Sequence, residues 1–228
     1  MSRSDHSFCS RMKNFAAIAF NISGLICYLL LSILSLATMS FSIQAAEPSL
    51  PTNKTTWVFV DPAVKDYQQL IGDLPADAEL RILQADRDGV SQIAEELYDQ
   101  RHIAQIHLIS HGRDGEIQAG NTWLSADNID NARNHLAFIG EALATNGSIY
   151  IYGCQVAAGV KGKALLNNIA SITNASVAAS DDWTGDTKQG GNWQLETVIG
   201  SVQVSTIPLN KSYPHLLNTI NAGDMVVL

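Results

Sequence analysis

A histidine and a cysteine follow two apolar segments of this chain, and side chains of these two types can carry nucleophilic chemistry together. Residues 106–110 are followed by His111 and a glycine, and residues 149–152 are followed by a glycine and Cys154. A thiol is a weak nucleophile until its proton is removed, and an imidazole can take that proton or hold the thiolate as an ion pair. Cys154 and His111 are therefore a candidate catalytic dyad.

The glycines beside these two residues suit the same chemistry. Acyl transfer needs hydrogen-bond donors for the oxyanion that develops, and backbone N–H groups at tight glycine turns can supply them. Gly112 and Gly153 stand where such donors are needed. Asp61 follows an earlier apolar segment, where it either orients His111, lines the binding pocket, or simply forms a turn before Pro62.

Cysteine usage supports a role for Cys154. The chain has three cysteines, and Cys9 and Cys27 both lie within residues 1–46. We expect those residues to be a secretory signal, because basic residues precede an uncharged apolar run and small residues follow it. The exported part then holds one unpaired cysteine, which indicates a reactive thiol or an intermolecular disulfide. The alternative is a buried, inert thiol.

The apolar run within the expected signal, residues 15–37, is also long enough to span a membrane. If it stays uncleaved, it anchors the protein as a signal anchor; no other contact with a membrane is expected. In both cases we expect the remainder to be periplasmic, exposed on the cell surface or extracellular.

The composition restricts the function classes. Hydrophobic residues make up 46% and charged residues 16% of the chain, which is sufficient for a packed core. The formal net charge is −8, which argues against a nucleic-acid partner because such partners require a basic surface. Three histidines, His102, His107 and His111, lie near one another, but no second thiol or group of carboxylates completes a metal site, so we expect no metal and no cofactor.

The elements that position the dyad follow from the apolar patterns. Strands are predicted at 57–60, 79–83, 103–110, 148–152 and 176–179. Helices are predicted at 64–74, 90–98 (capped by Asp88), 162–173 and, after a cap at Ser125, over the apolar stripe 129–143. A small hairpin is expected at 116–124. This alternation indicates an α/β sandwich with a mostly parallel sheet and helices on both faces.

The same alternation places the candidate residues. In open parallel sheets, ligands bind beyond the carboxyl ends of the strands. Asp61, His111, Cys154 and Asp181 all stand at such ends. We expect a linker at 47–55, one domain at 56–216, a C-terminal β-hairpin extension formed by 192–197 and 202–205, and a tail at 217–228.

These residues also carry a resemblance. A strand ending in Ser-His-Gly and a later one ending in Gly-Cys resemble the caspase-like cysteine peptidases. Residues 56–216 more closely resemble an uncharacterised bacterial domain family found near the N-termini of large exported adhesin-type proteins. The landmarks that carry this second resemblance are, in chain order, residues 58–61, 107–112, 152–157, 178–185 and 191–196.

The resemblance implies roles for individual residues. Cys154 would be the nucleophile and His111 the general base and acid, with the N–H groups of Gly112 and Cys154 as the oxyanion hole. Asp181 or Asp182 would recognise Arg or Lys in a specificity pocket, or else form a solvated acidic loop. In the caspase-like pattern another small residue often stands at the position of Gly153.

Two functions follow from the resemblance. The first is an exported cysteine peptidase that cleaves itself or acts on a protein or peptide substrate at the cell surface. The second is a catalytically inactive module of the same fold that binds a cell-surface protein partner. An open cleft around Cys154 favours the first, and a Cys154 enclosed by packing favours the second.

Overall fold

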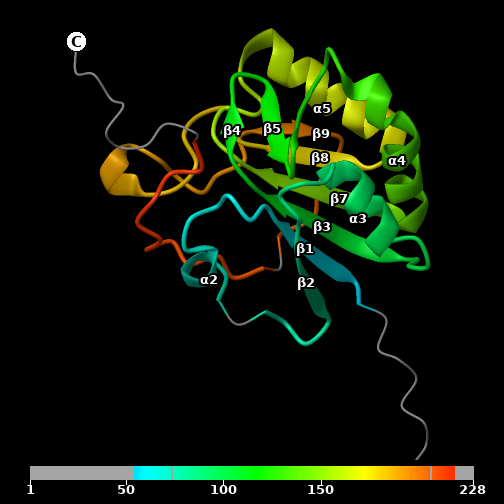
Figure 1. Cartoon of the computed structure of the whole chain (residues 1–228), viewed down its shortest axis with the longest axis horizontal. Coiled ribbons are helices and arrows are strands. Elements are labelled where there is room, and N and C mark those ends of the chain that lie inside the picture. The colour runs from blue at the N-terminus through cyan, green and yellow to red at the C-terminus, as the bar shows by residue number, and fades with distance from the viewer. Residues whose placement is uncertain (1–53, 73, 206, 219–228) are drawn as a thin grey trace, which may run out of the picture. The chain divides into compact units, whose positions relative to one another are not determined.

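The computed structural model describes residues 54–72, 74–205 and 207–218, and these form an α/β sandwich (Figure 1). The central sheet has the strand order β2-β1-β3-β7-β8-β9. Five of its strands are parallel and the last, β9, runs antiparallel to β8. The sheet strands are β1 Thr56–Val60, β2 Ala78–Ile82, β3 Ile103–Ile109, β7 Leu143–Tyr152, β8 Ser176–Ala179 and β9 Thr197–Ile199. The predicted mostly parallel α/β fold is confirmed.

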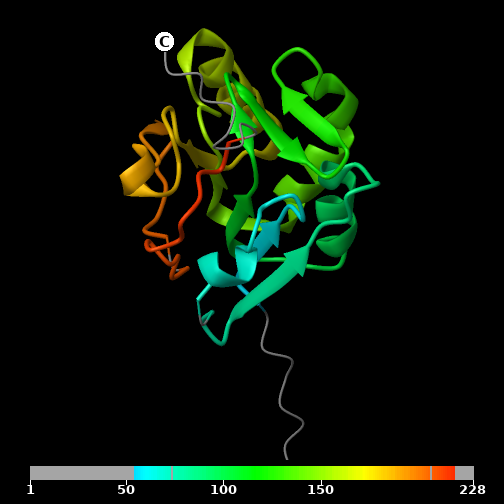
Figure 2. The ribbon, with the colours of Figure 1, turned by 60° about the vertical axis from the view of Figure 1, so that its left-hand side comes forward.

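Two apolar clusters hold the layers together. On one face, inward residues of the strands, such as Phe59 and Ile151, pack against three helices. These helices are α3 Gly89–Glu96, α4 Ile129–Ala142 and α5 Gly159–Thr173. Alternate residues of the same strands, such as Val58 and Tyr152, face the other side. There the short helix α2, Tyr67–Leu70, and the C-terminal segments cover the sheet, as Figures 1 and 2 show.

The loop after β3 forms a small separate sheet beside the strand ends. Its strands are β4 Gly112–Arg113, β5 Glu116–Ala119 and β6 Thr122–Ser125. The antiparallel pairing of β5 with β6 confirms the predicted hairpin. Because β4 begins at Gly112, this sheet starts at the residue that follows His111.

Two predicted helices have different bounds. The helix expected over 64–74 forms only one turn, because Asp66 adopts a left-handed conformation with φ of 50° and stops the helix from extending toward Val64. The helix expected after a cap at Ser125 begins at Ile129. Asn128 is the residue at its cap position, and its side chain accepts the N–H of Ser125 at 2.9 Å. Asp88 does cap α3, accepting the N–H of Ser91 at 2.7 Å.

The predicted hairpin of 192–197 and 202–205 does not form, because β9 pairs with β8 and no strand follows it among the described residues. The segment 201–205 instead crosses the sheet face and bonds to side chains there. Gln105 Nε2 donates to the Val204 carbonyl at 2.7 Å, and Tyr150 donates its hydroxyl to the Gln203 carbonyl. These polar side chains on β3 and β7 satisfy the segment's backbone and replace the expected strand pairing.

A buried histidine makes the stability of this fold depend on pH. His107 on β3 stacks on Tyr150 with ring centroids 4.6 Å apart, and its Nε2 lies 3.1 Å from Gln105 Oε1. Burial lowers the pKa of His107 from 6.5 to about 3. Protonating this ring in the folded protein is therefore costly.

We predict that the free energy of unfolding falls as pH drops below 6.5 and continues to fall until about 3. In that window the unfolded chain binds a proton at His107 that the folded chain does not, which removes about 1.4 kcal/mol per pH unit at most. Above 6.5 the residue is neutral in both states and contributes no slope. Urea unfolding at a series of pH values would measure this, with His107→Phe as the comparison. An identical pH slope in both proteins would contradict the prediction.

Candidate active site

The parallel pairing of β3 with β7 brings the two candidate loops to the same edge of the sheet. Ile109 pairs with Tyr152, and the N–H of Ser110 donates to the Tyr152 carbonyl at 3.0 Å. His111 and Cys154 therefore leave neighbouring strands at corresponding positions. Gly112 makes this close approach possible, because a Cβ there would clash with the Cys154 carbonyl oxygen and lie 2.8 Å from the Gly153 carbonyl carbon.

His111 has a defined tautomer. Its Nε2 lies 3.0 Å from the carbonyl oxygen of Ala63, and because a carbonyl can only accept, Nε2 carries the proton. Nδ1 is buried and has no hydrogen-bond partner among the described residues. The ring is thus held by one nitrogen, and in its neutral form Nδ1 carries the lone pair.

Asp61 holds the loop that orients this ring. The Asp61 side chain is buried, and its Oδ1 accepts the N–H of Ala63 at 2.9 Å. Its Oδ2 accepts the N–H of Gly120, in the turn between β5 and β6, at 2.7 Å. Asp61 therefore acts on His111 through the backbone of Ala63, and among the described residues its carboxylate bonds to neither the ring nor the thiol.

We predict that Asp61→Ala lowers the free energy of unfolding by about 2–4 kcal/mol, because two backbone donors lose a charged acceptor. With the Ala63 N–H no longer bonded, the Ala63 carbonyl should also hold His111 less firmly. Denaturant unfolding would measure the change. Asp130→Ala, which removes an exposed pair with Arg133, should cost less than about 1 kcal/mol. Equal losses in the two variants would argue against a structural role for Asp61.

Cys154 is enclosed in this structure, with 1% of its surface exposed. The N–H of Thr184 donates to Sγ at 3.3 Å, and the thiol donates to the Thr184 carbonyl at 3.5 Å. Burial raises the pKa of the Cys154 thiol to about 11, while hydrogen bonds from the backbone of Thr184 act in the opposite direction. At neutral pH the thiol is therefore protonated here, so a base must take its proton before it can react.

Two backbone donors beside the thiol converge on one oxygen. The N–H of Gly112 and the N–H of Cys154 donate to the carbonyl oxygen of Leu217, at 3.0 and 3.1 Å. A carbonyl held by two N–H groups at such distances, next to a cysteine side chain, has the arrangement that an oxyanion hole requires. These are the two donors that the sequence resemblance indicates.

Asp181 and Asp182 are exposed, and their carboxylates are occupied by bonds within their own loop. Asn192 Nδ2 donates to both carboxylate oxygens of Asp182, at 3.1 and 2.8 Å. The Thr197 hydroxyl donates to the Asp181 carboxylate at 3.2 Å. These bonds do not direct either carboxylate toward a pocket beside Cys154. The structure thus brings the backbones of Gly112 and Cys154 together, holds the His111 ring on the Ala63 carbonyl, and bonds the thiol to Thr184. Among the described residues no hydrogen bond joins the ring to the thiol. Asp61 acts on the Ala63 backbone, and Asp181 and Asp182 are exposed.

Three groups of this site were not foreseen from the sequence: the Ala63 carbonyl, the Thr184 peptide and the Leu217 carbonyl. All three are backbone groups, which every residue type supplies, so no residue pattern marks them. Leu217 stands at the start of the expected tail, yet its side chain is fully buried in the domain.

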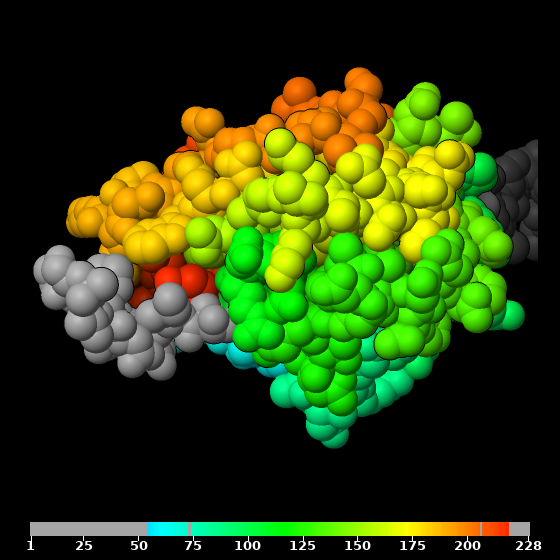
Figure 3. All heavy atoms as spheres, turned by 90° about the horizontal axis from the view of Figure 1, so that it is seen from above, coloured from blue at the N-terminus to red at the C-terminus, as the bar shows by residue number. Residues whose placement is uncertain are grey.

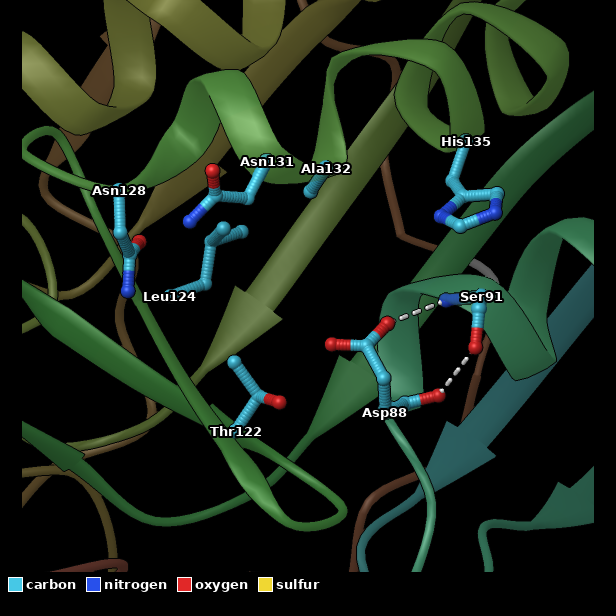
Figure 4. A pocket seen from close by; sticks show the side chains of 8 residues that line it. All are labelled: Asp88, Ser91, Thr122, Leu124, Asn128, Asn131, Ala132 and His135. Carbon is cyan, nitrogen blue, oxygen red and sulfur yellow. Dashed lines mark hydrogen bonds between the residues drawn. The ribbon is translucent and has the colours of Figure 1, made fainter.

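A pocket of about 170 Å³ lies elsewhere, between α3, α4 and β6 (Figure 4). Its polar side chains include Asp88 and His135, but the Asp88 carboxylate is engaged as the cap of α3. Within the described residues, no three His, Cys, Asp or Glu side chains are grouped so that they could hold a metal ion. None of the helices described is both long and apolar enough to cross a membrane, and residues 15–37 lie outside the described residues.

Comparison with known proteins gives one family. The model of a family described as Domain of unknown function (DUF4347) matches residues 57–217. No curated protein and no solved structure matches the chain. The matched range begins with β1 and ends at Leu217, so it includes every group of the site described above.

Proposed function

The chain belongs to the DUF4347 family, and on that premise we propose that residues 56–216 act as an exported, caspase-like cysteine peptidase domain. Cys154 is the nucleophile and His111 the general base and acid. The observation that carries this proposal is the convergence of the Gly112 and Cys154 N–H groups on one carbonyl oxygen. Proteins and peptides at the cell surface, including this chain itself, are the substrate class.

The two N–H groups supply the electrostatic part of catalysis. When a nucleophile adds to a peptide carbonyl, negative charge develops on the oxygen, and donors already in place stabilise it without reorganising. Gly112 and Cys154 hold such an oxygen at 3.0 and 3.1 Å. Because both donors are backbone groups fixed by the ends of β3 and β7, the hole is part of the sheet edge itself.

His111 supplies the proton transfers. Its Nδ1 takes the thiol proton as Sγ bonds to the peptide carbon, and then gives that proton to the leaving amine. The Ala63 carbonyl, which accepts from Nε2, stabilises the charged imidazolium formed in between. Water then enters, loses a proton to His111 and releases the acyl group from sulfur. The backbone of Ala63 is thus the orienting third group of this site.

A thiol-directed probe tests the proposal. An electrophile attached to a leucine-containing peptide should modify Cys154, identified by mass spectrometry of the adduct, and a peptide library should be hydrolysed. Both assays are run on the wild-type chain and on Leu217→Ala, in which the occupying carbonyl is held less firmly. If neither protein hydrolyses a peptide or is labelled at Cys154 between about pH 6 and 9, where an activated thiol ionises, the proposal is overturned.

A second candidate function rests on the enclosure of Cys154. A thiol with 1% exposure and a pKa raised to about 11 is also what a catalytically inactive module would have, with the domain serving to bind a cell-surface protein. The same assays separate the two: a binding module takes no label at Cys154 and hydrolyses no peptide after Leu217→Ala has loosened the site.

A further inference from the structure

Residues 215–218, which we name the C-terminal strap, lie along the candidate active site as an added strand. The N–H of Leu217 donates to the Thr184 carbonyl at 2.9 Å, and the N–H of Asp186 donates to the His215 carbonyl at 3.1 Å. Leu216 and Gly185 form an antiparallel bridge, and Asn218 forms a parallel bridge with Gly112. Extended peptides that bind by adding a strand use main-chain bonds of this kind.

The strap occupies its groove closely. Gly185 lies under it with φ of 131°, and a Cβ at that position would clash with the His215 carbonyl and lie 2.9 Å from the Leu216 Cα. At Gly191 a Cβ would lie 2.6 Å from a methyl group of Leu216. Two glycines therefore leave space for this segment. Figure 3 shows the red end of the described chain set between the yellow-orange and green parts of the surface.

The Leu217 side chain fills an apolar site. It is fully buried, in the same cluster as Cys154, Ile109 and Tyr213. Its carbonyl oxygen is the one that Gly112 and Cys154 hold. The strap therefore has a buried side chain, a carbonyl held by the two N–H groups and a following residue, Asn218, that bridges to Gly112: the parts of a peptide substrate in order.

We propose that the strap is the domain's own substrate and that the domain cuts the peptide bond between Leu217 and Asn218 in the same chain. This inference rests on the proposed cysteine peptidase function and adds to it a named bond. It also specifies an apolar, leucine-sized residue before the cut. That differs from the Arg or Lys expected from Asp181 and Asp182, whose carboxylates are bonded within their own loop.

The chemical step balances with water as the only co-reactant. His111 Nδ1 takes the Cys154 proton while Sγ bonds to the Leu217 carbonyl carbon. The C–N bond then breaks, and His111 returns the proton to the amine of Asn218. Water adds to the thioester with loss of a proton to His111, the S–C bond breaks, and that proton returns to sulfur. The products are a Leu217 carboxylate and an Asn218 amine.

The strap also explains why Cys154 is enclosed. Leu217 and Thr184 are bonded to each other and both contact Cys154, so loosening the strap should expose the thiol. Leu217→Ala removes most of the buried side chain, whereas Val160→Ala truncates an exposed apolar residue on α5, outside the strap, and serves as the control. We expect Cys154 to react with iodoacetamide at least about tenfold faster in Leu217→Ala than in Val160→Ala.

The test of the cut is the intact mass of the full chain over time. The wild-type chain should yield a product that ends at Leu217 and a peptide that begins at Asn218, at a rate independent of protein concentration. Cys154→Ser should stay intact, Leu217→Ala should be cut much more slowly, and Val160→Ala should be cut like the wild type. Circular dichroism confirms that each variant is folded.

Each other outcome decides against the inference. If the chain stays intact, or is cut at another bond, while peptides are hydrolysed at Cys154, the inference is overturned and the proposed function stands. A third result overturns both the inference and the proposed function: the chain stays intact, and neither the wild type nor Leu217→Ala hydrolyses a peptide or is labelled at Cys154. A cut after Leu217 that persists in Cys154→Ser, or whose rate rises with protein concentration, also overturns it.

Discussion

Replacing Cys154 with alanine should lower peptide hydrolysis by a factor on the order of 10⁶, to the level of the uncatalysed background, since removing a nucleophile has effects of this size in enzymes that act through a covalent intermediate. The oxyanion donors would remain, because the N–H of residue 154 belongs to the backbone. Truncating the buried thiol also leaves only a small cavity, so the variant should fold.

The measurement is hydrolysis of the best peptide from the library, with the free energy of unfolding determined in parallel. Ser110→Ala is a suitable control, because its buried hydroxyl lies at the same sheet edge and has no hydrogen-bond partner among the described residues. That change should leave hydrolysis within a fewfold of wild type. Activity of Cys154→Ala within about tenfold of the wild type would exclude Cys154 as the nucleophile.

Replacing His111 with alanine should slow hydrolysis by about 10²–10⁴-fold, the range typical of a general acid and base. The reason is the state of the thiol: with its pKa raised to about 11, Cys154 depends on a base for deprotonation. The defect should become smaller as pH rises toward 11, because hydroxide then removes the proton that His111 normally takes.

The pH dependence distinguishes this role from a structural one. A variant that is simply destabilised would lose activity at every pH, and its midpoint of unfolding would shift with it. His135→Ala, on α4, removes an imidazole far from the strand ends in sequence and should leave the pH profile unchanged. In Cys154→Ala/His111→Ala the losses should not multiply, since the two residues act in the same step. Multiplied losses would argue against a dyad.

On the proposed function, the strap would also keep other substrates out of the site. The strap adds a strand, fills the apolar site with Leu217 and occupies the oxyanion hole with a carbonyl. An intramolecular segment of this kind competes with any other substrate at a high effective concentration. Cleavage after Leu217 would release the chain from Asn218 onward and leave Leu217 as a new C-terminus that is still joined to the domain through Leu216.

The sequence by itself determined the fold class and the strand ends at which the two candidate residues lie. Apolar β-branched strands alternate with helices, and the carboxyl ends of parallel strands meet at one edge of the sheet. His111 and Cys154 each follow such a strand, so their placement on adjacent strand ends could be predicted before any coordinates. The hairpin at 116–124 was predictable for a similar reason, because turn residues separate two short alternating segments.

Only the tertiary structure decided what surrounds the dyad. The partner of His111 is the carbonyl of Ala63, and the oxyanion hole holds the carbonyl of Leu217; both are groups that any residue would provide. The path of the strap is set by the burial of Leu217 in a cluster drawn from distant strands, not by a local period. Every residue has a backbone oxygen, so the sequence does not indicate which of these oxygens will contact the site. Only the packing of the folded chain determines that.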